Sequence, residues 1–264
     1  SRPVVLCDKN SLKTISGKIG AFCDDTRDAV KGSLMDLNAR GFANGGGIHA
    51  HKLHHCLTGW AGSYGAFRTP YQTITYLSCH DDWTLWDKLV STLDEKKEFT
   101  GYQQEVLRAN RLAAAINFCC QGRPFFLAGE EMMRSKDGDH NSYNSSDEIN
   151  NIDWEVLTET SNEYQMMLYY KGLIEMRKEY EIFRANSGVS VSFSSLPGGG
   201  IVAKYEGNGS QAVVLINPNG FEDSYTLDGE WKLVANGTQA GADVISTASG
   251  AVTVDACSIM VFVK

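Results

Sequence analysis

A histidine and two carboxylates follow one of the apolar runs of the sequence. Residues 73–77 are rich in β-branched and aromatic side chains, and His80, Asp81 and Asp82 come shortly after them. An imidazole beside a carboxylate can bind hydroxyl groups and can stabilise positive charge that develops during a reaction. A His-Asp pair that stands alone is more often part of a turn or a helix cap, so its role must be judged from the residues around it.

Two further apolar runs also end in paired acidic residues. These are residues 19–22 before Asp24-Asp25, and residues 124–128 before Glu130-Glu131. Short apolar runs bounded by turn residues are typical of buried strands. We therefore predict three strands, each with acidic side chains at its C-terminal end.

Helical periodicity follows the second and third runs. Apolar residues recur at three- and four-residue spacing in residues 102–120 and 162–178, which predicts two helices. The predicted capping boxes at their starts are Thr100 with Gln103, and Thr160 with Glu163. Strands that alternate with helices indicate parallel β/α units. In a (β/α)₈ barrel the chemistry lies at the C-terminal ends of the strands, where these acidic residues fall.

The chain after about residue 180 has a different pattern, with short β-rich runs separated by Gly and Asn. The predicted strands are residues 201–205, 211–216, 231–235, 251–254 and 258–263. Such spacing favours a small antiparallel β-sandwich. The predicted fold is the C-terminal portion of a (β/α)₈ TIM barrel in residues 1–180, followed by an all-β sandwich in residues 181–264. Three strands do not close a barrel, so about five β/α units must come from elsewhere.

Four motifs in order resemble the α-amylase family, glycoside hydrolase family 13. Residues 76–89 (YLSCHDDWTLWDKL) are similar to its strand-seven motif, which in type I pullulanases reads close to SHDN-x-TLWD. Residues 122–131 resemble the strand-eight motif, and residues 138–154 resemble the pullulanase loop after it. Residues 22–32 resemble the strand-six region. Asp82 departs from the pattern, since Asn is usual there.

The resemblance implies a role for each matching residue. Asp81 matches the third catalytic carboxylate, which binds two hydroxyls of the sugar and stabilises the oxocarbenium-like transition state without attacking it. His80 matches a histidine that contacts the same sugar. Arg134, Asp139 and Tyr143 lie in the loop expected to line the glycone subsites, although that loop is rich in residues that bond to their own backbone.

The tryptophans have two interpretations. Trp83 is a candidate for stacking on a sugar ring, with core packing as the equally weighted alternative, while core packing is favoured for Trp86. Trp60 carries the same two alternatives.

Hydrolysis with retention needs two further carboxylates, a nucleophile and an acid. The sequence contains neither a GFRFD-like nor a GE-x-W-like motif. We therefore expect a fragment of a debranching enzyme for α-1,6 bonds of pullulan, starch or glycogen, inactive alone and completed by an N-terminal portion. The alternative is a non-catalytic α-glucan-binding or structural module. The upstream sequence would discriminate between the two.

The composition limits the kinds of partner that we expect the protein to bind. The net charge of −8 and the lack of a basic block disfavour nucleic acid and anionic membranes, and no apolar run is long enough to span a bilayer. No organic cofactor or metal is predicted, while calcium, oligomeric state and localisation (secreted, cell-surface or cytoplasmic in a bacterium) stay open. The chain begins with Ser1 and no signal peptide, as expected of a fragment or a processed product.

The histidine cluster and the cysteines have structural interpretations. The nearby histidines are predicted to lie on a solvated loop or helix face because no metal-ligand spacing accompanies them: His49, His51, His54 and His55. The seven cysteines include no CxxC pair and are expected to be mostly buried free thiols in a reducing setting.

Overall fold

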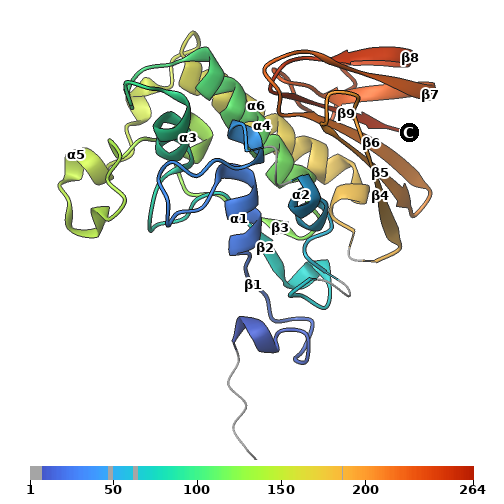
Figure 1. The fold of residues 1–264 in the computed structure, drawn as a ribbon, viewed down its shortest axis with the longest axis horizontal. Helices are drawn as coiled ribbons and strands as arrows, with labels where there is room; N and C mark the ends of the chain where they lie inside the picture. The colour runs from blue at the N-terminus through green and yellow to red at the C-terminus, as the bar shows by residue number, and fades with distance from the viewer. Residues whose placement is uncertain (1–7, 47–49, 62–64, 186) are drawn as a thin grey trace, which may run out of the picture.

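The fold is that of a computed structural model, which describes residues 8–46, 50–61, 65–185 and 187–264. A small parallel sheet with helices occupies the first part, and an antiparallel region follows (Figure 1). The helices are α1 (Asp24–Lys31), α2 (Ala50–Leu57), α3 (Leu85–Leu93), α4 (Gln104–Cys119), α5 (Asp147–Asn150) and α6 (Asn162–Glu179).

The three predicted strands form one parallel sheet in the order β1 (Ala21–Phe22), β2 (Thr73–Thr75) and β3 (Arg123–Pro124). Phe22 pairs with Ile74, and Thr75 pairs with Pro124. The strands are shorter than the apolar runs, and β3 begins one residue before the run predicted for it. Because parallel strands share a direction, the segments that follow them lie along one rim.

The predicted helices are present, but their predicted capping boxes are wrong. The N-cap of α4 is Gln103 and makes no side-chain cap; its amide nitrogen donates to Asp94 at 2.9 Å instead. The N-cap of α6 is Ser161, whose hydroxyl accepts from the backbone N–H of Tyr164 at 3.1 Å. In the first case the side chain finds a partner in the preceding loop, and in the second a serine one residue later serves as the cap.

The antiparallel strands are β4 (Val189–Ser195), β5 (Ile201–Gly207), β6 (Ser210–Asn217), β7 (Asp223–Ala235), β8 (Ser246–Val254) and β9 (Ser258–Val263). They pair in the order β4-β5-β6-β9-β7-β8. The five predicted strands lie within β5–β9, whereas β4 was not predicted. Its Val-Ser-Val-Ser-Phe alternation is half-buried and contains many serines, which weakens the apolar signal.

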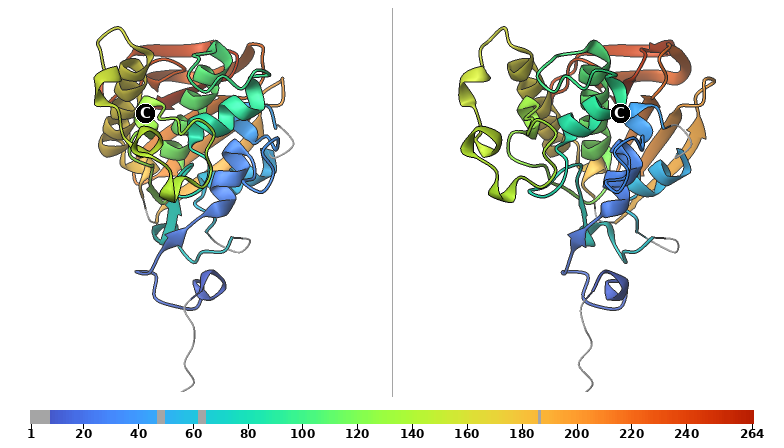
Figure 2. Two further views of the ribbon diagram at one scale, coloured as in Figure 1. Left: turned by 90° about the vertical axis from the view of Figure 1, so that its left-hand side faces the viewer. Right: turned by 60° about the vertical axis from the view of Figure 1, so that its left-hand side comes forward.

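Both faces of this sheet are buried, as in a sandwich. On β5, Ile201 and Ala203 face the core that contains α4 and α6, whereas Val202 faces a second apolar cluster with Trp231 of β7 and Val254 of β8. Figure 2 shows the antiparallel strands packed behind the helical layer. The larger core contains residues from both sides of residue 180, so the division into domains at that position stays a prediction.

Several side chains have the structural roles expected of them. Trp86 is buried in the core, and its indole N–H donates to the carbonyl of Phe99 at 2.8 Å. Trp60 packs partly buried against the core and stacks on His55 at a ring distance of 5.1 Å. His54 stacks on Phe193 at 4.1 Å. His51 of α2 is exposed as predicted, whereas His54 and His55 are half-buried in aromatic contacts rather than solvated. His49 lies outside the described residues.

Six of the seven cysteines fall in the described part of the chain, and all six are free thiols. Four are buried as predicted, and two are half-buried; Cys7 lies outside the described residues. Among the described residues, no helix combines the length and apolar character needed to cross a membrane.

Candidate functional site

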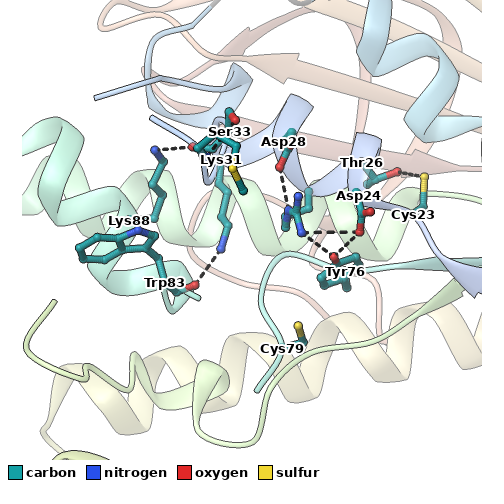
Figure 3. Close-up of polar contacts among 12 residues, drawn as sticks. Cys23, Asp24, Thr26, Asp28, Lys31, Ser33, Tyr76, Cys79, Trp83 and Lys88 are labelled. Atoms are coloured by element: carbon teal, nitrogen blue, oxygen red, sulfur yellow. Dashed lines mark hydrogen bonds and ion pairs between the residues drawn. The ribbon is translucent and has the colours of Figure 1, made fainter. Parts of the chain in front are cut away.

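The rim above β1 and β2 carries a network of ionised and phenolic groups. Tyr76, just after β2, donates its hydroxyl proton to Asp24 at 2.6 Å and accepts from Arg27 at 2.8 Å (Figure 3). Arg27 also donates to Asp28 at 2.7 Å. Burial raises the pKa of Asp24, but hydrogen bonds from Lys9 and Tyr76 outweigh it and hold that pKa below its usual value. This network fixes the first turn of α1 to the end of β2.

Asp81 and His80 are exposed on the loop that follows β2. The thiol of Cys79 donates to Oδ1 of Asp81 at 2.5 Å, and this hydrogen bond is the largest influence lowering the pKa of Asp81. A carboxylate that stays ionised and open to solvent can accept hydrogen bonds from sugar hydroxyls. Asp82 has a left-handed backbone with φ of 61°, a conformation that Asp and Asn tolerate better than most residues.

Trp83 joins this loop to the one after β3. Its ring is half-buried and stacks on His140 with centroids 5.5 Å apart and planes 18° apart. Trp83 therefore stacks on a protein side chain of another loop. It is neither packed in the core nor fully free to stack on a sugar. One face of Trp83 is occupied by His140.

Asp139 and Tyr143 differ in how much of each side chain is available to a ligand. Asp139 accepts from the backbone N–H of Asn141 at 2.9 Å and from the hydroxyl of Ser145 at 2.5 Å, and the Ser145 bond is the main cause of its lowered pKa. Its carboxylate is therefore bonded within its own loop, as the structural alternative expected. Tyr143 is 83% exposed and is available to a ligand.

Arg134 lies in a cleft of about 270 Å³ whose lining includes Tyr102, Asp153 and Glu163 but not Asp81 or His80. Its guanidinium donates to the backbone carbonyls of Ala128 and Asn150. The Nε of Arg134 is buried without a hydrogen-bond partner in the described part of the chain. Burial lowers the pKa of Arg134. This residue thus holds the loop between β3 and α6 while leaving one donor unused.

Three charged groups next to the Asp81 loop were not predicted as functional. Lys31 donates to the carbonyl of Trp83 at 3.0 Å, Lys136 donates to the carbonyl of His80 at 3.3 Å, and Glu130 accepts from the hydroxyl of Ser78. All three are buried. A Lys near the end of a helix usually signals a solvated cation at the helix C-terminus, so the sequence offered no sign of burial for Lys31.

The same loop brings three side chains of metal-ligand type together. The ligand atoms of Cys79, His80 and Asp81 lie within 4.8 Å of one another, the one such group of three within the described ranges. Burial raises the pKa of the Cys79 thiol to about 11, and metals bind the thiolate. These residues therefore fit a metal poorly, and the carboxylate and imidazole are better suited to hydroxyl groups.

Comparisons with known proteins relate the chain to pullulanases. No family model matches the chain. The chain is 39% identical over 176 residues to a pullulanase of Bacillus subtilis, a match that covers 66% of this chain and 23% of that protein. It thus spans about a quarter of the length of this curated relative.

Solved structures give the same result over more of the chain. The pullulanase of Bacillus acidopullulyticus superposes with a TM-score of 0.80 at 27% identity, covering 93% of this chain and 30% of that one. A pullulanase of Anoxybacillus complexed with maltotetraose superposes with a TM-score of 0.77 at 28% identity, covering 93% of this chain and 35% of the other.

Proposed function

Since this chain is homologous to the pullulanases, we propose that it forms the C-terminal part of a glycoside hydrolase that debranches α-glucans. Its three parallel strands would be the last strands of a (β/α)₈ barrel, and its substrate would be an α-glucan with α-1,6 branch bonds. The maltotetraose bound to the Anoxybacillus structure supports an α-glucan as the ligand.

Asp81 carries the proposal because its surroundings suit a stabilising role. It is exposed on the loop that follows a parallel strand, and Cys79 holds its pKa low, so it is ionised at neutral pH. An ionised carboxylate can accept hydrogen bonds from two sugar hydroxyls, and such bonds tighten as the oxocarbenium-like transition state forms. His80 beside it would contact the same sugar.

The other two carboxylates would come from an N-terminal portion of the same enzyme. A retaining hydrolase places its nucleophile and acid about 5–5.5 Å apart, and no motif for either was found in this sequence. Within the described ranges, β1 and β3 pair only with β2, so each offers a free edge to another strand. Phe22 on β1 and Phe125 directly after β3 are both 37% exposed and touch edge to face, as expected of side chains that a completed barrel would cover.

The loop after β3 would line the glycone side. Tyr143 is free to pack on a ring, whereas Asp139 and Arg134 would chiefly shape the loop that presents it. Trp83, already stacked on His140, would contact sugar through its remaining surface.

Intact-mass and N-terminal analysis of the native protein, coupled to a pullulan reducing-sugar assay, tests the proposal. We expect the 264-residue chain to release no reducing sugar alone and to do so with its N-terminal portion. Hydrolysis by the chain alone would contradict the division of roles. A chain that occurs alone, is inert and binds pullulan would instead be the non-catalytic module.

A further inference from the structure

We propose that Lys31 and Glu130 are positioning residues that fix the two ends of residues 78–83 and thereby hold Asp81 and His80 in place for the sugar. This inference rests on the proposed function for the identity of the ligand. The positioning itself is a property of the chain and can be measured without any glucan.

Lys31 fixes the far end of the segment. It is the last residue of α1, is 1% exposed, and its ammonium donates to the backbone carbonyl of Trp83 at 3.0 Å (Figure 3). No carboxylate lies within ion-pair distance of it among the described residues. Burying an ammonium without an ion pair costs stability, and an apolar side chain of similar size would avoid that cost. Besides its longer-range attraction to Glu130, the ammonium provides the hydrogen bond to Trp83.

Glu130 fixes the near end. It follows β3, is 4% exposed, and accepts from the hydroxyls of Ser78 and Tyr170, the latter at 3.1 Å. Tyr170 belongs to α6, so the contact ties the start of the segment to that helix. Lys136 adds a third contact through the carbonyl of His80 at 3.3 Å.

These contacts matter because Asp81 has little else to hold it. It is exposed, and the hydrogen bond of its side chain within the described part comes from Cys79, two residues away in the same loop. The direction of its carboxylate therefore depends on the backbone of residues 78–83. Neighbouring β/α units fix that backbone at both ends, one from α1 and the other from the turn after β3.

The test compares two buried lysines of α1 and α3. Lys31→Met removes the donor to Trp83, whereas Lys88→Met removes an equally buried ammonium that donates to the carbonyls of Ser33, Asp36 and Leu37 instead. The backbone order parameters of residues 79–83 would be measured by ¹⁵N relaxation in the 264-residue chain. We expect values near 0.85 in the unmodified chain and in Lys88→Met, and below about 0.6 in Lys31→Met.

Ser78→Ala gives a second measurement that leaves both Lys31 and Glu130 in place. It removes the contact with Glu130, and we expect the order parameters of Cys79 and His80 to fall as in Lys31→Met. Unchanged order in both Lys31→Met and Ser78→Ala would overturn the positioning roles.

Affinity electrophoresis in pullulan gels separates this inference from the proposed function. Asp81→Asn should abolish the retardation of the unmodified chain, and Lys31→Met should weaken it about fivefold while Lys88→Met does not. If Asp81→Asn migrates like the unmodified chain, the proposed function fails whatever the order parameters show. If Asp81→Asn loses retardation but Lys31→Met binds and stays ordered, the positioning role fails alone.

Discussion

The thiol of Cys79 lies 2.5 Å from Oδ1 of Asp81, and this hydrogen bond joins the proposed catalytic carboxylate to a side chain of the same loop after β2. The bond stabilises the ionised form of Asp81, which under the proposed function is the form that would accept hydrogen bonds from sugar hydroxyls. Since Cys79 supplies the largest contribution to the lowered pKa, this residue tunes Asp81 directly.

Cys79→Ala should therefore raise the pKa of Asp81 towards its ordinary value. Cys79→Ser retains a donor at the same position and should leave the pKa low. The ¹³C chemical shift of the Asp81 carboxyl, followed through a pH titration, measures both. An unchanged pKa in Cys79→Ala would show that the thiol does not influence Asp81.

The raised pKa of Glu130 predicts that the free energy of unfolding depends on pH. Burial raises its pKa above the ordinary 4.5, so the folded chain holds a proton that the unfolded chain has already released. The free energy of unfolding should then fall as the pH rises from about 4.5 to the raised folded value. Glu130→Gln cannot ionise and should flatten this part of the profile.

Urea unfolding at a series of pH values measures the Glu130 effect. Glu131→Gln is the matched control, because Glu131 is adjacent and only half-buried. A profile that keeps the same slope in Glu130→Gln would assign the dependence to other groups.

Arg177 of α6 should be important for stability. It is buried, and its guanidinium donates to the carbonyls of Phe118, Cys120 and Gly122 at 2.7, 2.8 and 2.7 Å, which holds the turn between α4 and β3. Arg177→Met leaves these carbonyls without their donor and should lower the free energy of unfolding by about 3 kcal/mol. Lys178→Met, at the neighbouring exposed position, should change it by less than about 0.5 kcal/mol. Equal effects of the two substitutions would contradict this role.

Periodicity predicted the elements that carry the site better than it predicted their ends. The runs before Asp24, His80 and Glu130 are parallel neighbours as expected, because apolar β-branched runs between turn residues bury well. The capping boxes failed because α4 begins after Gln103, whose side chain bonds to Asp94, and because Ser161 rather than Thr160 caps α6.

Site residues that stand in a recognisable motif could be predicted from the sequence. Residues whose role depends on their burial could not. His80 and Asp81 stand in a recognisable segment, and their exposure agrees with a ligand-binding role. Lys31 could not be recognised because its position on α1 resembles a solvated helix end, and only the packing of the loop against it excludes water. Asp139 shows the opposite case, in which a promising carboxylate is already satisfied by Ser145.

The hydrolysis of pullulan by the chain joined to its N-terminal portion tests the role of Asp81 most directly. Asp81→Asn should reduce kcat about 10²–10³-fold, because the hydrogen bonds from Asp81 to the sugar tighten further as the transition state forms. Asp82→Asn is the matched control; its left-handed backbone accepts Asn, so activity should stay within about twofold of the unmodified enzyme. Full activity in Asp81→Asn, or an equal loss in both variants, would contradict the assignment of Asp81 as the stabilising carboxylate.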